Sequence, residues 1–362
     1  MHPDYRTQYP YRMDDARSRL ACKLRRQARS CASLGSPLYE LILERAAEDV
    51  ETGGSIWRVL EGREDDPKGS ARALRFVGAV HRLVLSGAAP ALDPFYPSVG
   101  GDGRRPGIWD AFLAVVEDNV DLLRELALRP VQTNEVGRAG ALVGGFLEVA
   151  RTTGRPLRTL ELGTSAGLNL RWDHFFYEAR GKTWGDPTSP VRLCDYNSER
   201  PLPFDVEVEV VERAGCDEHP LDPATSDGYL TLASYVWPDQ VHRHRLLKAA
   251  VEVAKRVPAR VDAAGAGDWL ERELKGRPEG SATVVFHSIV MQYVDPDERE
   301  RIEDLFEEYG AAAADESPLA RLKMEPAGEI ANVSLEIWPP GGEWLVATTG
   351  YHGAAIRWLG LS

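Results

Sequence analysis

A glycine-rich turn between residues 163 and 167 is the segment of the sequence best suited to chemistry. An apolar run from Leu157 to Leu162 contains one acid, Glu161, and the next residues are Gly163-Thr164-Ser165-Ala166-Gly167-Leu168-Asn169. Glycines let the backbone approach a ligand closely and adopt φ values that other residues avoid. The N–H groups at the start of a following helix attract a polar or anionic group. The acid would accept a hydrogen bond from an ammonium group or from bound water.

Several chemistries compete for this turn. The dinucleotide fingerprint Gly-x-Gly-x-x-Gly is not matched. A serine hydrolase is an alternative, because Gly-x-Ser-x-Gly surrounds Ser165 and His352 lies late in the chain, as the order Ser, Asp, His requires. A third interpretation is a methyltransferase site. Glu161, Gly163 and Gly167 resemble the first motif of class I S-adenosylmethionine-dependent methyltransferases, acid-x-Gly-x-x-x-Gly. A tight turn with a purely structural role is the remaining reading.

The elements that must position this turn differ between the two halves of the chain. Residues 15 to 154 show apolar spacing of three and four, which indicates amphipathic helices. One of them begins at Ser36 as N-cap with Pro37 in its first turn. From Pro156 onward short apolar runs alternate with helical stretches, which predicts a parallel sheet. These runs are Leu157–Leu162, Val206–Val211, Arg260–Asp262, Thr283–His287 and Leu319–Met324.

Two last runs, Val333–Trp338 and Trp344–Thr348, are separated by Pro339, Pro340, Gly341 and Gly342. This spacing predicts a terminal hairpin. No run before Leu157 is typical of a strand, so the glycine turn follows the first strand of the sheet. A hydrolase elbow instead follows several strands. In open α/β folds nucleotide-type ligands bind at the carboxyl ends of such strands, so the position favours the methyltransferase reading.

Composition excludes several classes of protein. The 362 residues include 43 Lys plus Arg and 56 Asp plus Glu, so the formal net charge is −13. This charge disfavours nucleic acid and acidic membrane surfaces as partners, because both demand a basic face. No Cys-x-x-Cys pair suggests a metal site. No signal peptide and no apolar run of about 18 residues is found, so we expect a cytoplasmic protein.

The chain as a whole resembles a bacterial family, the domain-of-unknown-function family numbered 2332, which is regarded as methyltransferase-like. The resemblance extends from about Leu24 to Leu359. It rests on the glycine turn and on four further segments, which are residues 130–138, Gly215-Cys216-Asp217-Glu218-His219-Pro220-Leu221-Asp222, Tyr235-Val236-Trp237-Pro238-Asp239-Gln240 and Val284-Val285-Phe286-His287-Ser288. The family supplies no established catalytic residue.

The methyltransferase fold implies positions for cofactor-binding side chains. Glu161, Gly163, Thr164, Ser165, Gly167 and Asn169 would line the cofactor at the turn. An acid after the second strand would bind the ribose, and Asp217 is favoured over Asp195, although 217 − 161 = 56 positions implies an insertion at about residues 171–205. Asp268 and Trp269 follow the third strand, toward the adenine. Alternatively, Asp268 only caps a helix.

Residues beside these positions are candidates for catalysis and for binding the methionine part. His287 and Ser288 end the fourth strand; His287 is the first candidate for a base, and Ser288 would contact the cofactor. Glu135 and Asp173 are the next candidates for a base. Asn134 and Arg138 would also hold the cofactor, because a guanidinium binds a carboxylate in bidentate fashion. Each of these residues has a structural alternative, such as a helix cap or packing.

These observations together predict an α/β protein. A helical N-terminal domain, residues 1–154, would cover the site, and a Rossmann-like methyltransferase domain, residues 155–362, would end in a β-hairpin. The predicted function is S-adenosyl-L-methionine-dependent methyl transfer to a small molecule. The alternatives are a Ser165 hydrolase and a non-catalytic S-adenosylmethionine- or nucleotide-binding protein.

Overall fold

The computed structural model describes residues 16–63, 71–198 and 200–361. The chain divides into two compact units, one formed by residues 1–131 with 233–241 and the other by residues 132–232 with 242–362. No helix within the described residues is long and apolar enough to cross a membrane.

The first unit is helical, as its apolar spacing predicts. Its elements are α1 (Ala16–Ser33), α2 (Pro37–Thr52), α3 (Ser55–Leu60), α4 (Arg72–Leu85), the 3-10 helices η2 (Pro90–Phe95) and η3 (Pro97–Val99), α5 (Ile108–Asp118) and α6 (Val120–Leu126). The predicted cap at Ser36 is confirmed, since its hydroxyl accepts a hydrogen bond from the Tyr39 N–H. Asp239, within the second segment of this unit, reinforces the cap by accepting from Ser36 Oγ at 2.8 Å and from the Leu38 N–H at 3.1 Å.

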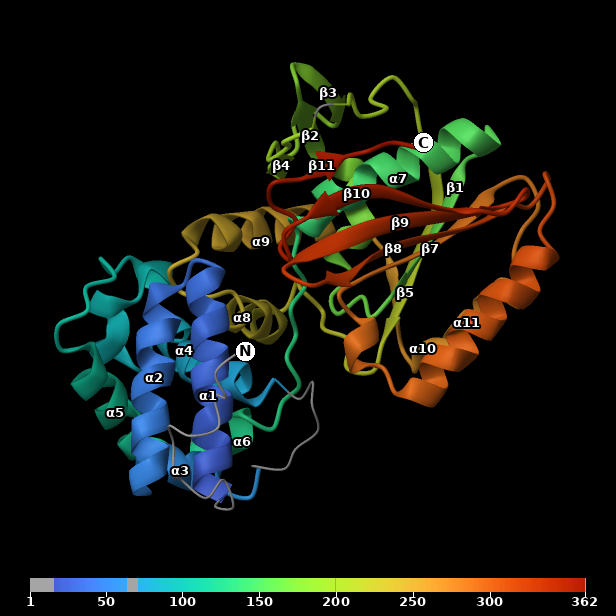
Figure 1. The fold of residues 1–362 in the computed structure, drawn as a ribbon. Helices are drawn as coiled ribbons and strands as arrows, with labels where there is room; N and C mark the ends of the chain where they lie inside the picture. The colour runs from blue at the N-terminus through green and yellow to red at the C-terminus, as the bar shows by residue number, and fades with distance from the viewer. Residues whose placement is uncertain (1–15, 64–70, 199, 362) are drawn as a thin grey trace, which may run out of the picture. The chain divides into compact units, whose positions relative to one another are not determined.

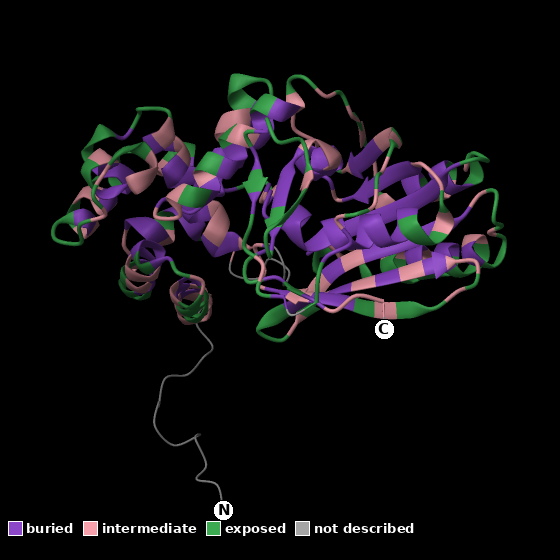
Figure 2. Cartoon of the chain, turned by 90° about the horizontal axis from the view of Figure 1, so that it is seen from above, coloured by how far each residue is buried: buried purple, intermediate pink, exposed green. Residues whose placement is uncertain are grey.

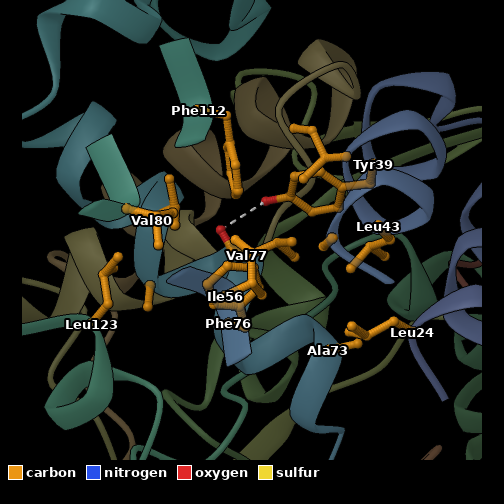
Figure 3. Close-up of a cluster of buried hydrophobic side chains, with 14 of the residues drawn as sticks. Leu24, Tyr39, Leu43, Ile56, Ala73, Phe76, Val77, Val80, Phe112 and Leu123 are labelled. Atoms are coloured by element: carbon orange, nitrogen blue, oxygen red, sulfur yellow. Dashed lines mark hydrogen bonds between the residues drawn. The ribbon is translucent and has the colours of Figure 1, made fainter. Parts of the chain in front are cut away.

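Aromatic and aliphatic side chains from α2, α4 and α5 fill the centre of the helical unit (Figure 3). Phe76 and Phe112 meet edge to face, with ring centroids 5.9 Å apart. The Tyr39 hydroxyl donates to the Val77 carbonyl at 3.4 Å, which satisfies a polar group inside this apolar cluster. Trp237 tilts against the Tyr39 ring at 6.2 Å, so this residue of the second segment belongs to the core of the unit.

The second unit contains the predicted sheet, which is mixed and mostly parallel (Figure 1). Its spatial order is β11-β10-β9-β8-β7-β1-β5-β6. The strands are β1 (Leu157–Leu162), β5 (Val210–Asp217), β6 (Arg260–Ala263), β7 (Ala282–Ser288), β8 (Leu319–Ala327), β9 (Ile330–Trp338), β10 (Glu343–Thr349) and β11 (Arg357–Trp358). The neighbouring strands β6, β5, β1, β7 and β8 run parallel to one another. Strands β9, β10 and β11 continue the sheet beyond β8 with antiparallel pairing.

The sheet confirms the strand pattern with two differences. The predicted hairpin is present as β9 and β10, but β8 and β9 also pair antiparallel, so the sheet ends in consecutive hairpins. The second strand lies at Val210–Asp217 rather than Val206–Val211, because pairing with β1 selects the run that ends in small buried residues. Between β1 and β5 the chain forms η4 (Leu168–His174) and a separate three-stranded sheet of β2 (Phe176–Ala179), β3 (Lys182–Gly185) and β4 (Arg192–Leu193).

Helices cover both faces of the large sheet, whose central strands are buried (Figure 2). On one face, α10 (Ala266–Lys275) and α11 (Pro296–Ala311) enclose an apolar core that includes Leu160 and Val285. On the other face lies α7 (Arg138–Thr153), whose Phe146 ring meets Phe286 of β7 edge to face at 5.0 Å. The unit is completed by the 3-10 helix η5 (Met291–Tyr293) and by α9 (Val241–Ala254), which continues from the first unit; α8 (Ser226–Ser234) also joins the two.

Glycines allow α7 to lie close to its neighbours. A Cβ on Gly144 would stand 2.5 Å from the Trp358 ring, and a Cβ on Gly140 would stand 3.0 Å from the end of the Ile356 side chain. The indole is rigid and buried, whereas the end of an isoleucine side chain can rotate. Gly144 is therefore required for the contact between α7 and β11.

Replacing this glycine should destabilise the protein although alanine favours helices. Gly→Ala inside a helix ordinarily stabilises by about 0.5–1 kcal/mol, but overpacking against a rigid group costs about 1–3 kcal/mol. We expect Gly144→Ala to lower the midpoint of urea unfolding, followed by tryptophan fluorescence, and Gly140→Ala to leave it nearly unchanged. Equal effects of the two substitutions would contradict this account of the packing.

Candidate functional site

The order of the large sheet reverses beside β1. From β1 the chain continues to β5 and β6 on one side, and then to β7 and β8 on the other. In open α/β sheets, ligands bind outside the carboxyl ends of the strands at such a reversal. Here those ends are Leu162 of β1 and Ser288 of β7, and the glycine turn follows directly after β1.

The glycine turn has the backbone conformation that its composition predicts. Gly163 and Gly167 have φ of 66° and 68°, and Ser165 also has a positive φ, 55°. This conformation is uncommon for a residue with a side chain and persists where the surroundings hold it. Asp217 provides part of this support, because its Oδ2 accepts from the Ser165 N–H at 2.9 Å. The structure therefore brings Asp217 to the turn, as predicted.

Both oxygens of the Asp217 carboxylate are engaged. Oδ1 accepts from the His219 N–H at 2.9 Å and lies 3.5 Å from Gln132 Nε2. The rival acid, Asp195, instead accepts from the Ala355 N–H at 2.9 Å, beside β11. Asp217 is the acid at the end of the second strand and Asp195 is not, while the binding of a ribose remains a prediction.

Residues 132–138 bind to the glycine turn through several polar side chains. Asn134 Oδ1 accepts from the Leu168 N–H at 2.9 Å, and Asn169 Nδ2 donates to the Glu135 carbonyl at 3.1 Å. The Ser165 hydroxyl donates to Gln132 Oε1. Asn134 and Asn169 were predicted site residues, whereas Gln132 was missed; its only signal was its place in the segment 130–138. The direct contacts of these two asparagines are with protein backbone.

Arg138 projects from the start of α7 toward the carboxyl end of β7. Its Nη1 donates to the Ser288 carbonyl at 2.9 Å, and its Nε donates to the Tyr351 carbonyl at 3.1 Å. The side chain is buried, and burial lowers the pKa of its guanidinium. Within the described residues it forms no ion pair with a carboxylate. A buried guanidinium bound only to carbonyls retains the capacity to bind an anion.

Glu161 is a buried acid on the same face of the sheet as Arg138. Only 2 % of its surface is exposed, and the Thr164 hydroxyl donates to its Oε2. Burial raises the pKa of Glu161 to about 8, although the Thr164 hydrogen bond and the charges of Arg171 and Arg138 favour its ionised form. In the described parts of the chain no basic side chain forms an ion pair with it. The carboxyl group is therefore protonated at neutral pH and would ionise beside a bound cation.

Glu135, a predicted base, is held in a buried ion pair with Arg243. Its Oε1 also accepts from the Gly137 N–H at 3.2 Å, and His352 Nδ1 lies 3.7 Å from its Oε2. Burial opposes the ionisation of Glu135, but Arg243, His352 and Arg138 together hold its pKa below the usual value. Glu135 therefore remains ionised at neutral pH. Burial and the two arginines lower the pKa of the His352 ring to about 4.

The other two predicted bases also have partners. His287 Nδ1 lies 2.8 Å from Glu325 Oε1, and burial lowers the pKa of this imidazole. Because side chains alternate along a strand, His287 shares the face of Val285, toward α10 and α11, and Ser288 lies on the face of α7. Asp173 Oδ2 accepts from Arg213 Nη2 at 2.5 Å. The structure thus separates His287 from Arg138 and Glu161.

Asp268 and Trp269 make their direct contacts with β6 and α11 and within the apolar core. Asp268 lies in the first turn of α10 as an exposed side chain and pairs with Arg301 at 2.6 Å. Trp269 is fully buried in the core between the sheet and α10, and its Nε1 donates to Asp262 at 2.7 Å. Their amphipathic helix turns the indole toward the core, so the direct contacts of both residues are structural.

The hydrolase alternative requires a hydrogen bond between Ser165 and a histidine base, and the described residues do not form one. The Ser165 hydroxyl donates to Gln132, and no histidine contacts it in the part of the chain that the structure describes. The Ser165 N–H, moreover, is bound to Asp217. A serine nucleophile requires an adjacent base to become reactive. The arrangement at Ser165 is that of a turn held in shape by its neighbours.

The mostly parallel sheet, with its polar turn at the reversal of strand order, defines an α/β protein with a candidate small-ligand site. The chain belongs to the family of uncharacterised proteins conserved in bacteria (DUF2332), whose family model matches residues 21–358. No curated protein and no solved structure matches the chain.

The glycine turn also contacts the segment after β7. A Cβ on Gly163 would stand 2.3 Å from Val290 Cγ2, so any larger residue at position 163 meets Val290. Gly154, at the end of α7, has a similar φ, 62°, but an added Cβ there meets nothing within 4 Å. Alanine substitutions at these two positions therefore distinguish the free-energy cost of the left-handed backbone from the cost of the contact with Val290.

We expect Gly163→Ala to destabilise the protein more than Gly154→Ala does. In both variants an alanine must adopt a left-handed backbone conformation, which costs about 1–2 kcal/mol of stability. Gly163→Ala also overpacks against Val290, which costs about 1–3 kcal/mol more. Val290→Ala should relieve only the second cost. A double-mutant cycle measured by urea unfolding should therefore show favourable coupling between 163 and 290 and none between 154 and 290.

The buried acid should make stability depend on pH. Between its ordinary pKa of 4.5 and the folded value of about 8, Glu161 is ionised in the unfolded chain and protonated in the folded one. Its contribution to stability is therefore present below pH 4.5 and is lost as pH rises toward 8. The free energy of unfolding of Glu161→Gln relative to the natural protein should rise over this range by up to a few kcal/mol. The exposed Glu178→Gln serves as control; a pH-independent difference for Glu161→Gln would contradict the assignment.

Proposed function

We propose that this protein is an S-adenosylmethionine-dependent methyltransferase that acts on a small molecule. The observation that carries the proposal is the presence of two buried side chains of opposite type, Arg138 and Glu161, on the same face of the sheet. Both are buried near the reversal of strand order, and neither forms an ion pair within the described residues. The charge of Arg138 favours ionisation of Glu161, in addition to the larger effect of Arg171. An α-amino acid presents the complementary groups, a carboxylate for Arg138 and an ammonium for Glu161.

The rest of the turn supports a nucleoside attached to that amino acid. Strands β6, β5, β1, β7 and β8 have the spatial order of a Rossmann-type sheet, with the glycine turn after the first of them in the chain. Asp217 ends the adjacent strand, and its Oδ2, which accepts from the Ser165 N–H, has a second lone pair with which to accept from a ribose hydroxyl. Asp268 and Trp269, the residues predicted for the adenine, make contacts elsewhere, so the proposal assigns them no cofactor contact.

Binding and orientation are the contributions that these residues support. S-adenosylmethionine, when bound, supplies an activated methyl group. Arg138 would hold the carboxylate, Glu161 would give its proton to solvent and hold the ammonium, and the turn would receive the nucleoside. Holding the acceptor in line with the methyl group supplies much of the rate enhancement in such a displacement. Glu135, ionised beside Arg243, would keep the segment that presents Arg138 in place.

Titration calorimetry separates the amino-acid contacts from the nucleoside contacts. S-adenosylhomocysteine and 5′-methylthioadenosine share the nucleoside, but only the first has the amino acid. We expect Arg138→Met to weaken the binding of S-adenosylhomocysteine about 10- to 100-fold, as the loss of a charge-assisted pair implies. The affinity for methylthioadenosine should be unchanged. Arg151→Met, an exposed position on the same helix, is the control. If neither compound binds the natural protein, the proposal fails.

Proton release tests Glu161 in the same experiment. Near pH 7, binding of the ammonium should ionise Glu161, so the measured heat should vary with the ionisation enthalpy of the buffer. This dependence should vanish in Glu161→Gln. Reaction with a fluorophosphonate that Ser165→Ala abolishes would instead support the hydrolase. Binding of S-adenosylhomocysteine without turnover of any methyl acceptor would support a non-catalytic binding protein.

A further inference from the structure

The segment that follows β7 contacts the glycine turn through Val290. Val290 approaches Gly163 so closely that even a methyl group on the glycine would collide with it at 2.3 Å. Since the turn lies at the reversal of strand order, Val290 occupies the space beside the backbone to which a ligand would come. The segment itself is at the surface, because Gln292 and Tyr293 are exposed and Val290 is half-buried.

One side chain holds the segment in this position. Glu325 Oε1, from β8, accepts from the Val290 N–H at 3.2 Å and lies 3.4 Å from the Met291 nitrogen. The same oxygen lies 2.8 Å from His287 Nδ1. A single carboxylate thus joins the end of β7 to two successive amides of the segment. Removing it would leave these amides to water.

The backbone between β7 and Val290 is strained. Ile289 has φ of 53°, a genuine outlier for a β-branched residue. Such strain persists only where neighbouring contacts impose it. Here the contacts are the hydrogen bond from the Ile289 N–H to the Met324 carbonyl at 2.8 Å, the bond from Arg138 to the Ser288 carbonyl, and Glu325. Release of Glu325 would allow the segment to leave the turn and the strain to relax.

We propose that residues 288–291 form a gate over the glycine turn, with Val290 as the blocking side chain and Glu325 as the positioning residue that holds it closed. The identity of what passes the gate rests on the proposed function, a nucleoside that carries an amino acid. Arg138 connects the two, because its guanidinium is bound to the carbonyl of Ser288 at the base of the gate. A carboxylate that recruits this guanidinium would loosen that bond.

The gate can be tested without a ligand by hydrogen–deuterium exchange. In Glu325→Ala, peptides that cover 288–293 should exchange about ten-fold faster or more, as the loss of hydrogen bonds to a charged group implies, while peptides of β8 should be unchanged. Glu325→Gln, which keeps an acceptor oxygen, should restore part of the protection. Glu329→Ala, an exposed acid on the same hairpin, is the control. Unchanged exchange in Glu325→Ala would overturn the proposal, whether or not any nucleoside binds.

The blocking role of Val290 is tested by the rate of S-adenosylhomocysteine association, followed by stopped-flow tryptophan fluorescence. We expect Val290→Ala and Glu325→Ala each to raise the association rate several-fold, and Val294→Ala, the same change at the other end of η5, to leave it unchanged. Equal rates in the natural protein and in both gate variants would overturn the gate. Absence of all binding, together with faster exchange in Glu325→Ala, would refute the proposed function and leave the movement of the segment supported.

Discussion

The need to satisfy polar groups in a buried turn governs the second unit. The glycine turn places successive backbone amides, two left-handed glycines and a left-handed serine at the end of the central strand. These groups would be costly without partners. Asp217 and Asn134 accept from the amides of Ser165 and Leu168, and Gln132 accepts from the Ser165 hydroxyl. The segment before α7 therefore supports the glycine turn, although the two are separated in the chain by α7 and β1.

The same segment determines which charges remain available. Glu135 is paired with Arg243, so its neighbour Arg138 is a buried cation that is bound to carbonyls, as Arg171 is. Across the turn, Glu161 accepts from the Thr164 hydroxyl, and no basic side chain of the described residues forms an ion pair with it. Burial keeps the Glu161 carboxyl group protonated, and it makes the charge of Arg138 costly where no carboxylate forms an ion pair with it. A zwitterionic ligand, as in the proposed function, would supply a counter-ion to each of the two groups.

Much of the architecture was predictable because it depends on local pattern. Spacing of three and four identified the helical unit, and Ser36 with Pro37 identified the start of α2. Alternating runs identified the strands, and a turn rich in Pro and Gly identified the hairpin of β9 and β10. The second strand was displaced by several residues, because its apolar pattern is weak and its register is selected by pairing with β1. The candidate site was less predictable, since Trp269 and His287 lie on the face of α10 and α11.

What the sequence by itself determined is the order of elements, the glycine turn after the first strand, and the residue types that could bind a nucleoside and an amino acid. Only the tertiary structure decided which of them meet. It joined Gln132 to Ser165 and Arg138 to Ser288, and it put Trp237 into the core of the helical unit. The physical reason is that periodicity specifies which face of an element is buried. The partner of a polar side chain is selected by hydrogen bonds between segments that are distant in the chain, and no local pattern records them.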